Sequence, residues 1–204
     1  MKSASLPTLF PIWKRALLGA LVLFTFATLH AEVSPAALVT AARSQVGVTL
    51  TYDAEYRDLP YPGGDVPKDK GVCTDVVVRA FREQSVDLQK DVHEDMKRNF
   101  AIYPKRWGLK KPDTNIDHRR VQNLQTYFSR QGWSQPVSKK AEDYAPGDLV
   151  TWELVPGTLA HIGIVSDRKT ADGVPLILHN IGQGAQEEDI LFKYGITGHY
   201  RVKK

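Results

Sequence analysis

The stretch Val72-Cys73-Thr74-Asp75-Val76-Val77-Val78-Arg79-Ala80-Phe81 combines a helical spacing of apolar residues with the single cysteine of the chain. Its apolar side chains recur on one helix face, which predicts a helix over 74–84 with Cys73 at its start. The positive end of a helix stabilises a thiolate and lowers the thiol pKa. A lone cysteine cannot form an intrachain disulfide, so Cys73 is either a small buried hydrophobe or a thiol kept for reactivity.

Helices are expected around this stretch, and strands in the back half of the chain. Apolar periodicity predicts helices over 35–46, 88–100 and 117–130, with Ser34 capping the first and Asp117 capping the last. Short apolar runs between Pro-Gly and Asp-Gly turns predict strands over the ranges 148–154, 161–167, 174–180 and 198–202. Helices followed by antiparallel strands predict an α+β fold.

The first 31 residues have the pattern of a secretory signal peptide. Lys14 and Arg15 precede an apolar run over 16–29, and Ala31 ends a plausible cleavage site. The run of about 14 residues is short for a membrane span of roughly 20, although an uncleaved anchor stays an alternative. We therefore expect a bacterial protein that is periplasmic or secreted, with no stable membrane anchor after cleavage.

The charge of the expected mature chain, residues 32–204, is nearly balanced. Removing Lys2, Lys14 and Arg15 from the 27 basic residues leaves 24, against 23 acidic ones. Neither this balance nor any dense basic run indicates a nucleic-acid partner. About 173 residues are enough for one domain with a substantial core.

Two histidines are placed to work with the cysteine. His161 opens one predicted strand and His179 lies near the end of the next, and a turn at Asp172-Gly173 makes these strands neighbours. Packing the Cys73 helix on the face that carries both imidazoles would complete a Cys–His–polar triad. In that triad the thiol attacks a carbonyl, His161 is the general base, and His179 orients it, with Asn180 as a weaker candidate. The alternative for each histidine is a satisfied structural imidazole.

Several motifs resemble the NlpC-type papain-like cell-wall peptidases. They are Pro146-Gly147-Asp148-Leu149-Val150-Thr151-Trp152, His161-Ile162-Gly163-Ile164-Val165, the Gly-Gly loop Pro60-Tyr61-Pro62-Gly63-Gly64 ahead of Cys73, and Ile177-Leu178-His179-Asn180. The resemblance implies a papain-like fold with N-terminal helices packed on an antiparallel sheet. It also implies that Tyr61 and the Cys73 backbone N–H are oxyanion donors.

Almost the whole mature chain resembles the YijF-like bacterial family, whose function is unassigned. The residues that carry this are Gly71–Val77, Val92-His93-Glu94-Asp95-Met96, Pro112–Val121 and His179-Asn180-Ile181-Gly182. Two features depart from the peptidase pattern. Thr74-Asp75 replaces the usual Ser-Gly, so Asp75 supports the helix dipole but opposes a thiolate. The interval from Cys73 to His161 is also long, and it contains a helical insert over about 85–145.

The insert carries further candidates. A metal site is conceivable among His93, Glu94, Asp95, Asp113, Asp117 and His118, but no His-Glu-x-x-His spacing occurs, so we expect neither a metal nor a cofactor. Arg119 and Arg120 are weak candidates for binding a substrate carboxylate, with salt-bridged structural roles as the alternative. Trp152 is a weak candidate for substrate contact. Trp107, Trp133 and Tyr103 could line a groove or belong to the core.

The combined reading is an exported cysteine hydrolase that cleaves an amide bond, with peptidoglycan stem peptides as the expected substrate. Two alternatives remain: a non-catalytic cell-envelope binding module on the same fold, and a thiol acyltransferase. The bond cleaved and the oligomeric state are not specified by the sequence.

Overall fold

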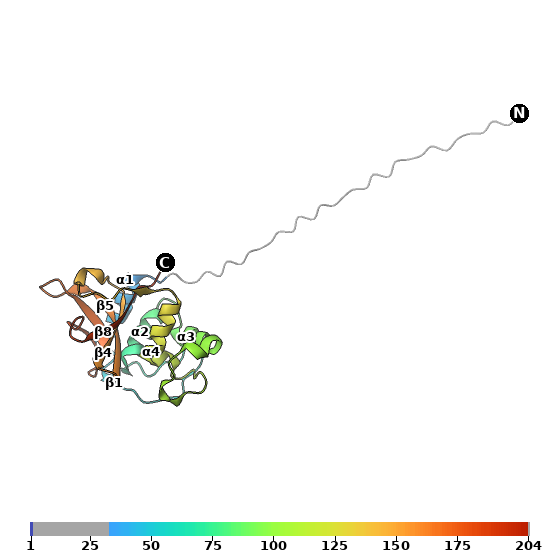
Figure 1. Ribbon diagram of the computed structural model, residues 1–204, viewed down its shortest axis with the longest axis horizontal. Helices are drawn as coiled ribbons and strands as arrows, with labels where there is room; N and C mark the ends of the chain where they lie inside the picture. The colour runs from blue at the N-terminus through green and yellow to red at the C-terminus, as the bar shows by residue number, and fades with distance from the viewer. Residues whose placement is uncertain (2–32, 204) are drawn as a thin grey trace. The chain divides into compact units, whose positions relative to one another are not determined.

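The computed structural model describes Met1 and residues 33–203 (Figure 1). The predicted signal peptide with its cleavage site after Ala31 therefore lies outside the described residues, apart from Met1. In the described part of the chain, no helix is long and apolar enough to cross a membrane.

Six strands between residues 33 and 203 form one antiparallel sheet in the order β3-β8-β4-β5-β6-β7. Their bounds are β3 Ser134–Gln135, β4 Leu149–Val155, β5 Leu159–Lys169, β6 Pro175–Asn180, β7 Ala185–Glu188 and β8 Gly195–Tyr200. A separate parallel pair joins β1, Thr51–Tyr52, to β2, Lys70–Gly71. This parallel pair places the segment just before Cys73 beside residues that lie about twenty positions earlier in the chain.

The helices precede the large sheet in the chain and pack on one of its faces (Figure 1). Their bounds are α1 Pro35–Arg43, α2 Cys73–Arg82, α3 Leu88–Asn99 and α4 Val121–Arg130, with short 3₁₀ turns at Phe100–Ile102, Arg106–Gly108, Asp117–Arg119 and Ala141–Asp143. Ser34 caps α1 through its hydroxyl, which accepts the Ala37 N–H. The expected fold class, α+β with N-terminal helices on an antiparallel sheet, is confirmed.

Apolar side chains fill both faces of the sheet, because successive residues of a strand point to opposite sides. The larger cluster joins the helices to Ile162, Ile164 and Leu178. The smaller cluster lies on the other face and includes Trp152 and Ile177. Each strand of the sheet centre therefore contributes to two cores.

The expected helix over 117–130 is broken at Arg120. This residue has extended backbone angles (φ −107°, ψ 116°) and separates the 3₁₀ turn at Asp117–Arg119 from α4. Asp117 does not cap α4, contrary to the sequence expectation. Its carboxylate instead accepts the N–H of Asp113 and lies 2.9 Å from Nδ1 of His93.

Candidate active site

Cys73 is the first residue of α2, as the sequence predicts. Val72 is the N-cap, and the carboxylate of Asp75 accepts the Val72 N–H at 2.7 Å, so the side chain in the first turn satisfies a backbone donor. Only 3% of Cys73 is exposed. The helix start therefore fixes the thiol inside the protein, close to the surface of the sheet.

The surroundings of the thiol oppose and support its ionisation at once. Burial raises the pKa of Cys73 to about 12, and the nearby Asp75 charge acts in the same direction. The backbone N–H groups of Ile162, Thr74 and Cys73 itself face the sulfur and would stabilise a negative charge there. At neutral pH the resting group is consequently the thiol, surrounded by donors that favour its charged form.

The two predicted histidines are adjacent in the structure. His161 Nε2 lies 3.0 Å from His179 Nδ1, and both rings are buried. The other ring nitrogen of His179 is 3.0 Å from a carboxylate oxygen of Glu188, although that contact is not aligned as a hydrogen bond. Glu188 lies on the edge strand β7, which sequence analysis did not predict.

Burial controls the charge of this pair. It lowers the pKa of His161 to about 3, and it lowers the pKa of His179 against the opposing effect of the Glu188 carboxylate. A neutral His179 with its proton on the nitrogen facing Glu188 accepts a hydrogen bond from His161 Nε2. The lone pair of His161 is then on Nδ1, which is the nitrogen available to act as a base.

The expectation that the Cys73 helix packs on the face carrying both imidazoles is wrong. Helix α2 packs on the face of Ile162, whereas His161 projects from the other face, beside Trp152. Strand alternation explains the difference, since neighbouring residues of β5 point to opposite sides. The thiol meets β5 at the Ile162 N–H, directly after His161 in the chain. Among the described residues, no hydrogen bond joins the thiol to either imidazole.

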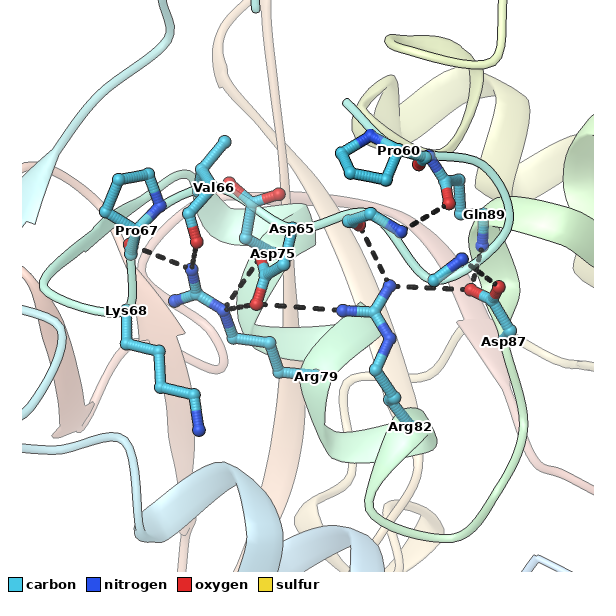
Figure 2. Close-up of polar contacts among 12 residues, drawn as sticks. Pro60, Asp65, Val66, Pro67, Lys68, Asp75, Arg79, Arg82, Asp87 and Gln89 are labelled. Carbon is cyan, nitrogen blue, oxygen red and sulfur yellow. Dashed lines mark hydrogen bonds and ion pairs between the residues drawn. The ribbon is translucent and has the colours of Figure 1, made fainter. Parts of the chain in front are cut away.

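The loop that leads to Cys73 is anchored to the back of α2 and to α3 (Figure 2). Arg79 donates through Nε to the Asp65 carboxylate and through Nη2 to the carbonyls of Val66 and Pro67. Arg82 donates to the Gly64 carbonyl. These bonds fix the Gly-Gly loop against the helix that begins at Cys73.

Tyr61, the oxyanion donor implied by the family resemblance, is directed away from Cys73. Its hydroxyl donates to Glu94 at 3.0 Å, and its ring packs edge-on against His93. The Cys73 pocket is lined by two other tyrosines, Tyr52 at the end of β1 and Tyr56. The clue to this pocket wall in the sequence was the Tyr-containing segment just upstream of the Gly-Gly loop.

The Cys73 pocket has a cavity volume of about 210 Å³ and lies between the start of α2, the start of β5 and the segment before α4. Its polar and aromatic lining comes mainly from the residues Tyr52, Tyr56, Trp107, Arg119, Arg120 and Gln122. Among the described residues, no histidine and no Asp or Glu side chain lines the Cys73 pocket. The pocket can therefore accommodate a small part of a ligand, with the buried Cys73 thiol in one wall.

Asp75 and Arg119 form a buried ion pair at this wall. Arg119 donates to both carboxylate oxygens of Asp75, at 3.1 and 3.0 Å, and also to the carbonyls of Asp53 and Glu55. Its side chain is only 2% exposed. Arg119 therefore supports the structure of the pocket, and the Asp75 carboxylate next to Cys73 is neutralised by a partner from the insert.

The other predicted site residues have structural partners. Trp152 is fully buried, with its indole N–H donating to the Leu191 carbonyl, so the structure gives it no access to a ligand. Asn180 points to the helix face and donates to the Gly71 carbonyl at 2.9 Å. Trp133 and Tyr103 belong to the core, whereas Trp107 is exposed at the pocket.

The acidic and histidine residues of the insert do not gather into a metal site. Among the described residues, no group of three or more His, Cys, Asp or Glu side chains is arranged to hold a metal ion. His93 pairs with Asp117, and Asp95 pairs with Arg130. These contacts connect α3 to the segments that follow it.

A family model described as "Domain of unknown function (DUF1287)" matches residues 39–202. A protein of Escherichia coli (strain K12) named "Uncharacterized protein YijF" is 55% identical over 201 residues, covering 92% of this chain and 98% of that protein. The chain therefore belongs to the DUF1287 family, which confirms the YijF-like resemblance. Among solved structures, that of NlpC1 from Trichomonas vaginalis matches 81% of this chain and 44% of its own, at 12% identity and a TM-score of 0.43.

Proposed function

We propose that this protein is an exported cysteine hydrolase that cleaves an amide bond in peptidoglycan stem peptides. The observation that carries the proposal is the position of Cys73 at the start of α2. Its sulfur faces three backbone N–H groups, lines a pocket, and lies against the peptide bond that follows His161. His161 is in turn hydrogen-bonded to His179. The order of these residues along the chain matches the NlpC-type peptidase motifs.

The reaction follows from these groups. The Cys73 sulfur attacks the amide carbonyl carbon while its proton passes to Nδ1 of His161, and the carbonyl oxygen becomes an oxyanion. The C–N bond then breaks, and the leaving amine takes the proton from His161. Water hydrolyses the resulting thioester with His161 again as the base, which releases the acid and restores the thiol. The backbone N–H groups near the sulfur are the available donors for the negative charge.

The resting protein contains no thiolate–imidazolium ion pair between Cys73 and His161, so the reaction requires general-base catalysis. With the pKa of the thiol raised to about 12 and that of His161 lowered to about 3, both groups are neutral at pH 7. The proton must leave the thiol as the new bond forms. Hydrogen bonds at catalytic groups are often unformed in the free enzyme and tighten in the substrate complex. Because the resting thiol and the His161 ring lie on opposite faces of the sheet, the mechanism also requires the imidazole to turn toward Cys73 in the substrate complex.

A non-catalytic envelope binding module is the second candidate. Its support is the same thiol, which is 97% shielded, has a raised pKa and makes no hydrogen bond to an imidazole in the described residues. Under this function the pocket would bind a peptide and leave it intact. Cys73 would then be a small side chain in the wall.

Turnover by the wild type, Cys73→Ala and His161→Ala separates these functions. Each protein is incubated with purified stem peptides, and newly released amines are quantified with an amine-reactive fluorophore. Release by the wild type alone supports the hydrolase, and circular dichroism checks that the variants are folded. Release by Cys73→Ala would refute the thiol mechanism. Binding of the peptide by all three proteins without release would support the binding module. With hydroxylamine added, a hydroxamate formed at the expense of the free acid would show that the thioester passes its acyl group to an amine as well as to water.

A further inference from the structure

Two neighbouring arginines line the Cys73 pocket, and their surroundings differ sharply. The N–H groups of Arg119 are directed to Asp75 and to two backbone carbonyls, as described above. The guanidinium of Arg120, in contrast, makes no hydrogen bond or ion pair with any described residue. Its Nε is shielded from solvent without an acceptor. An unsatisfied buried donor is costly, so the Arg120 side chain has an unmet requirement for an acceptor.

The position of Arg120 is maintained by an aromatic ring. The centre of its guanidinium lies 4.5 Å from the ring centroid of Trp107, a distance typical of a cation–π contact. Trp107 itself has a left-handed backbone (φ 63°, ψ 14°), which costs energy in a residue with a side chain. Strained backbone of this kind persists mainly at functional sites. The indole is 42% exposed, so the pair forms part of the pocket entrance.

The local charge is complementary to an anion. Asp75 already neutralises Arg119, and no acidic side chain of the described chain lines the pocket. Arg120 therefore contributes an uncompensated positive charge beside otherwise apolar or uncharged lining residues. Burial and the neighbouring Arg119 lower the pKa of Arg120, in agreement with an uncompensated cation.

We propose that the guanidinium of Arg120, stacked on Trp107, binds a carboxylate of the ligand while the ligand's amide lies at Cys73. A planar guanidinium matches a planar carboxylate through two parallel hydrogen bonds, and one free arginine suits a single negative charge. The proposed substrate class is thus a peptide with a free carboxylate near the bond that is cleaved. This inference rests on the proposed function for the role of the amide, but the carboxylate site exists independently of cleavage.

Binding measured without turnover tests the carboxylate site. Calorimetry on full-length mature Cys73→Ala protein uses two probes: a disaccharide-tetrapeptide muropeptide, and the same molecule with its carboxylates converted to amides. Arg120→Gln should weaken binding of the first probe by about 10- to 100-fold, as expected for a lost hydrogen-bonded charge. The amidated probe should bind weakly to both proteins, with little further loss from the substitution.

Control variants distinguish charge from geometry. Arg120→Lys should recover only part of the affinity, because a lysine cannot form the bidentate pair. Arg98→Gln, an exposed position on α3 outside the pocket, should leave binding unchanged. Melting curves check that each variant is folded.

The outcomes separate the two proposals. Equal affinity of Arg120→Gln and its parent for the carboxylate probe would overturn the inference, as would failure of the parent to bind that probe. Cleavage that depends on Cys73 but not on Arg120 would refute the carboxylate site and leave the hydrolase standing. Arg120-dependent binding without any cleavage would support the site and refute the hydrolase.

Discussion

Replacing Arg119 by methionine should destabilise the protein strongly while preserving most of the side-chain volume. The substitution leaves the Asp75 carboxylate, 4% exposed, without its cationic partner and leaves the Asp53 and Glu55 carbonyls without their donors. Removing one member of a buried ion pair costs about 3–5 kcal/mol. For a domain of this size, each kcal/mol lowers Tm by about 2–4 °C, so we expect a decrease of about 6–20 °C.

Thermal and urea unfolding at pH 7, followed by circular dichroism, measure this effect. A second substitution, Asp75→Asn, removes the buried charge but keeps an oxygen that can accept the Val72 N–H. The double variant should therefore be more stable than Arg119→Met alone, and the double-mutant cycle gives the coupling energy. Arg168→Gln is the matched control, because Arg168 is 64% exposed in its pair with Glu187 and should contribute about 0–1 kcal/mol. A loss in Arg119→Met no larger than in this control would refute the reasoning.

Three further predictions concern the thiol, the histidine pair and a buried acid. At pH 7 Cys73 should react with a disulfide reagent roughly a thousandfold more slowly than free cysteine, and the rate should rise about tenfold per pH unit up to pH 10; a plateau near pH 8 would contradict the raised pKa of about 12. His179→Ala should reduce kcat for stem-peptide cleavage at least about 100-fold, because it removes the partner that orients His161. A near-wild-type rate would contradict this role, since Asn180 is directed to the helix face and cannot replace it. Burial opposes ionisation of Asp148, but hydrogen bonds from Arg201 and His199 keep its pKa below the usual value. The contribution of Asp148 to stability is therefore present above about pH 4 and is lost as pH falls through the lowered pKa. Asp148→Asn should destabilise the protein most at neutral pH, and acid unfolding curves that stay parallel to the wild type would contradict this.

The sequence predicted those elements whose signals are local. Helical spacing located α1, α2 and α3, and turn residues with apolar runs located β4, β5, β6 and β8. Strand β7 was missed because its polar residues, Ala185–Glu188, lack the apolar alternation of a half-buried strand. The break at Arg120 was missed because periodicity continues across it.

The candidate site was predictable where it depends on neighbouring strands and not where it depends on distant packing. The pairing of His161 with His179 followed from the turn between their strands. The face on which α2 packs could not be obtained in this way, because both faces of β5 are apolar. The ion pair of Arg119 with Asp75 joins residues 44 positions apart. Only the structure therefore shows that Arg119 is paired and that Arg120 is not.

Liquid chromatography with mass spectrometry of purified muropeptides, incubated with mature wild-type protein or with Cys73→Ala, tests the central claim most directly. We expect a new pair of fragments whose combined mass exceeds that of the parent by one water. The pair should appear with the wild type and be absent with the variant. The masses of the pair would identify the amide bond. Unchanged muropeptides with folded wild-type protein, or the same fragments from both proteins, would contradict a hydrolase that acts through Cys73.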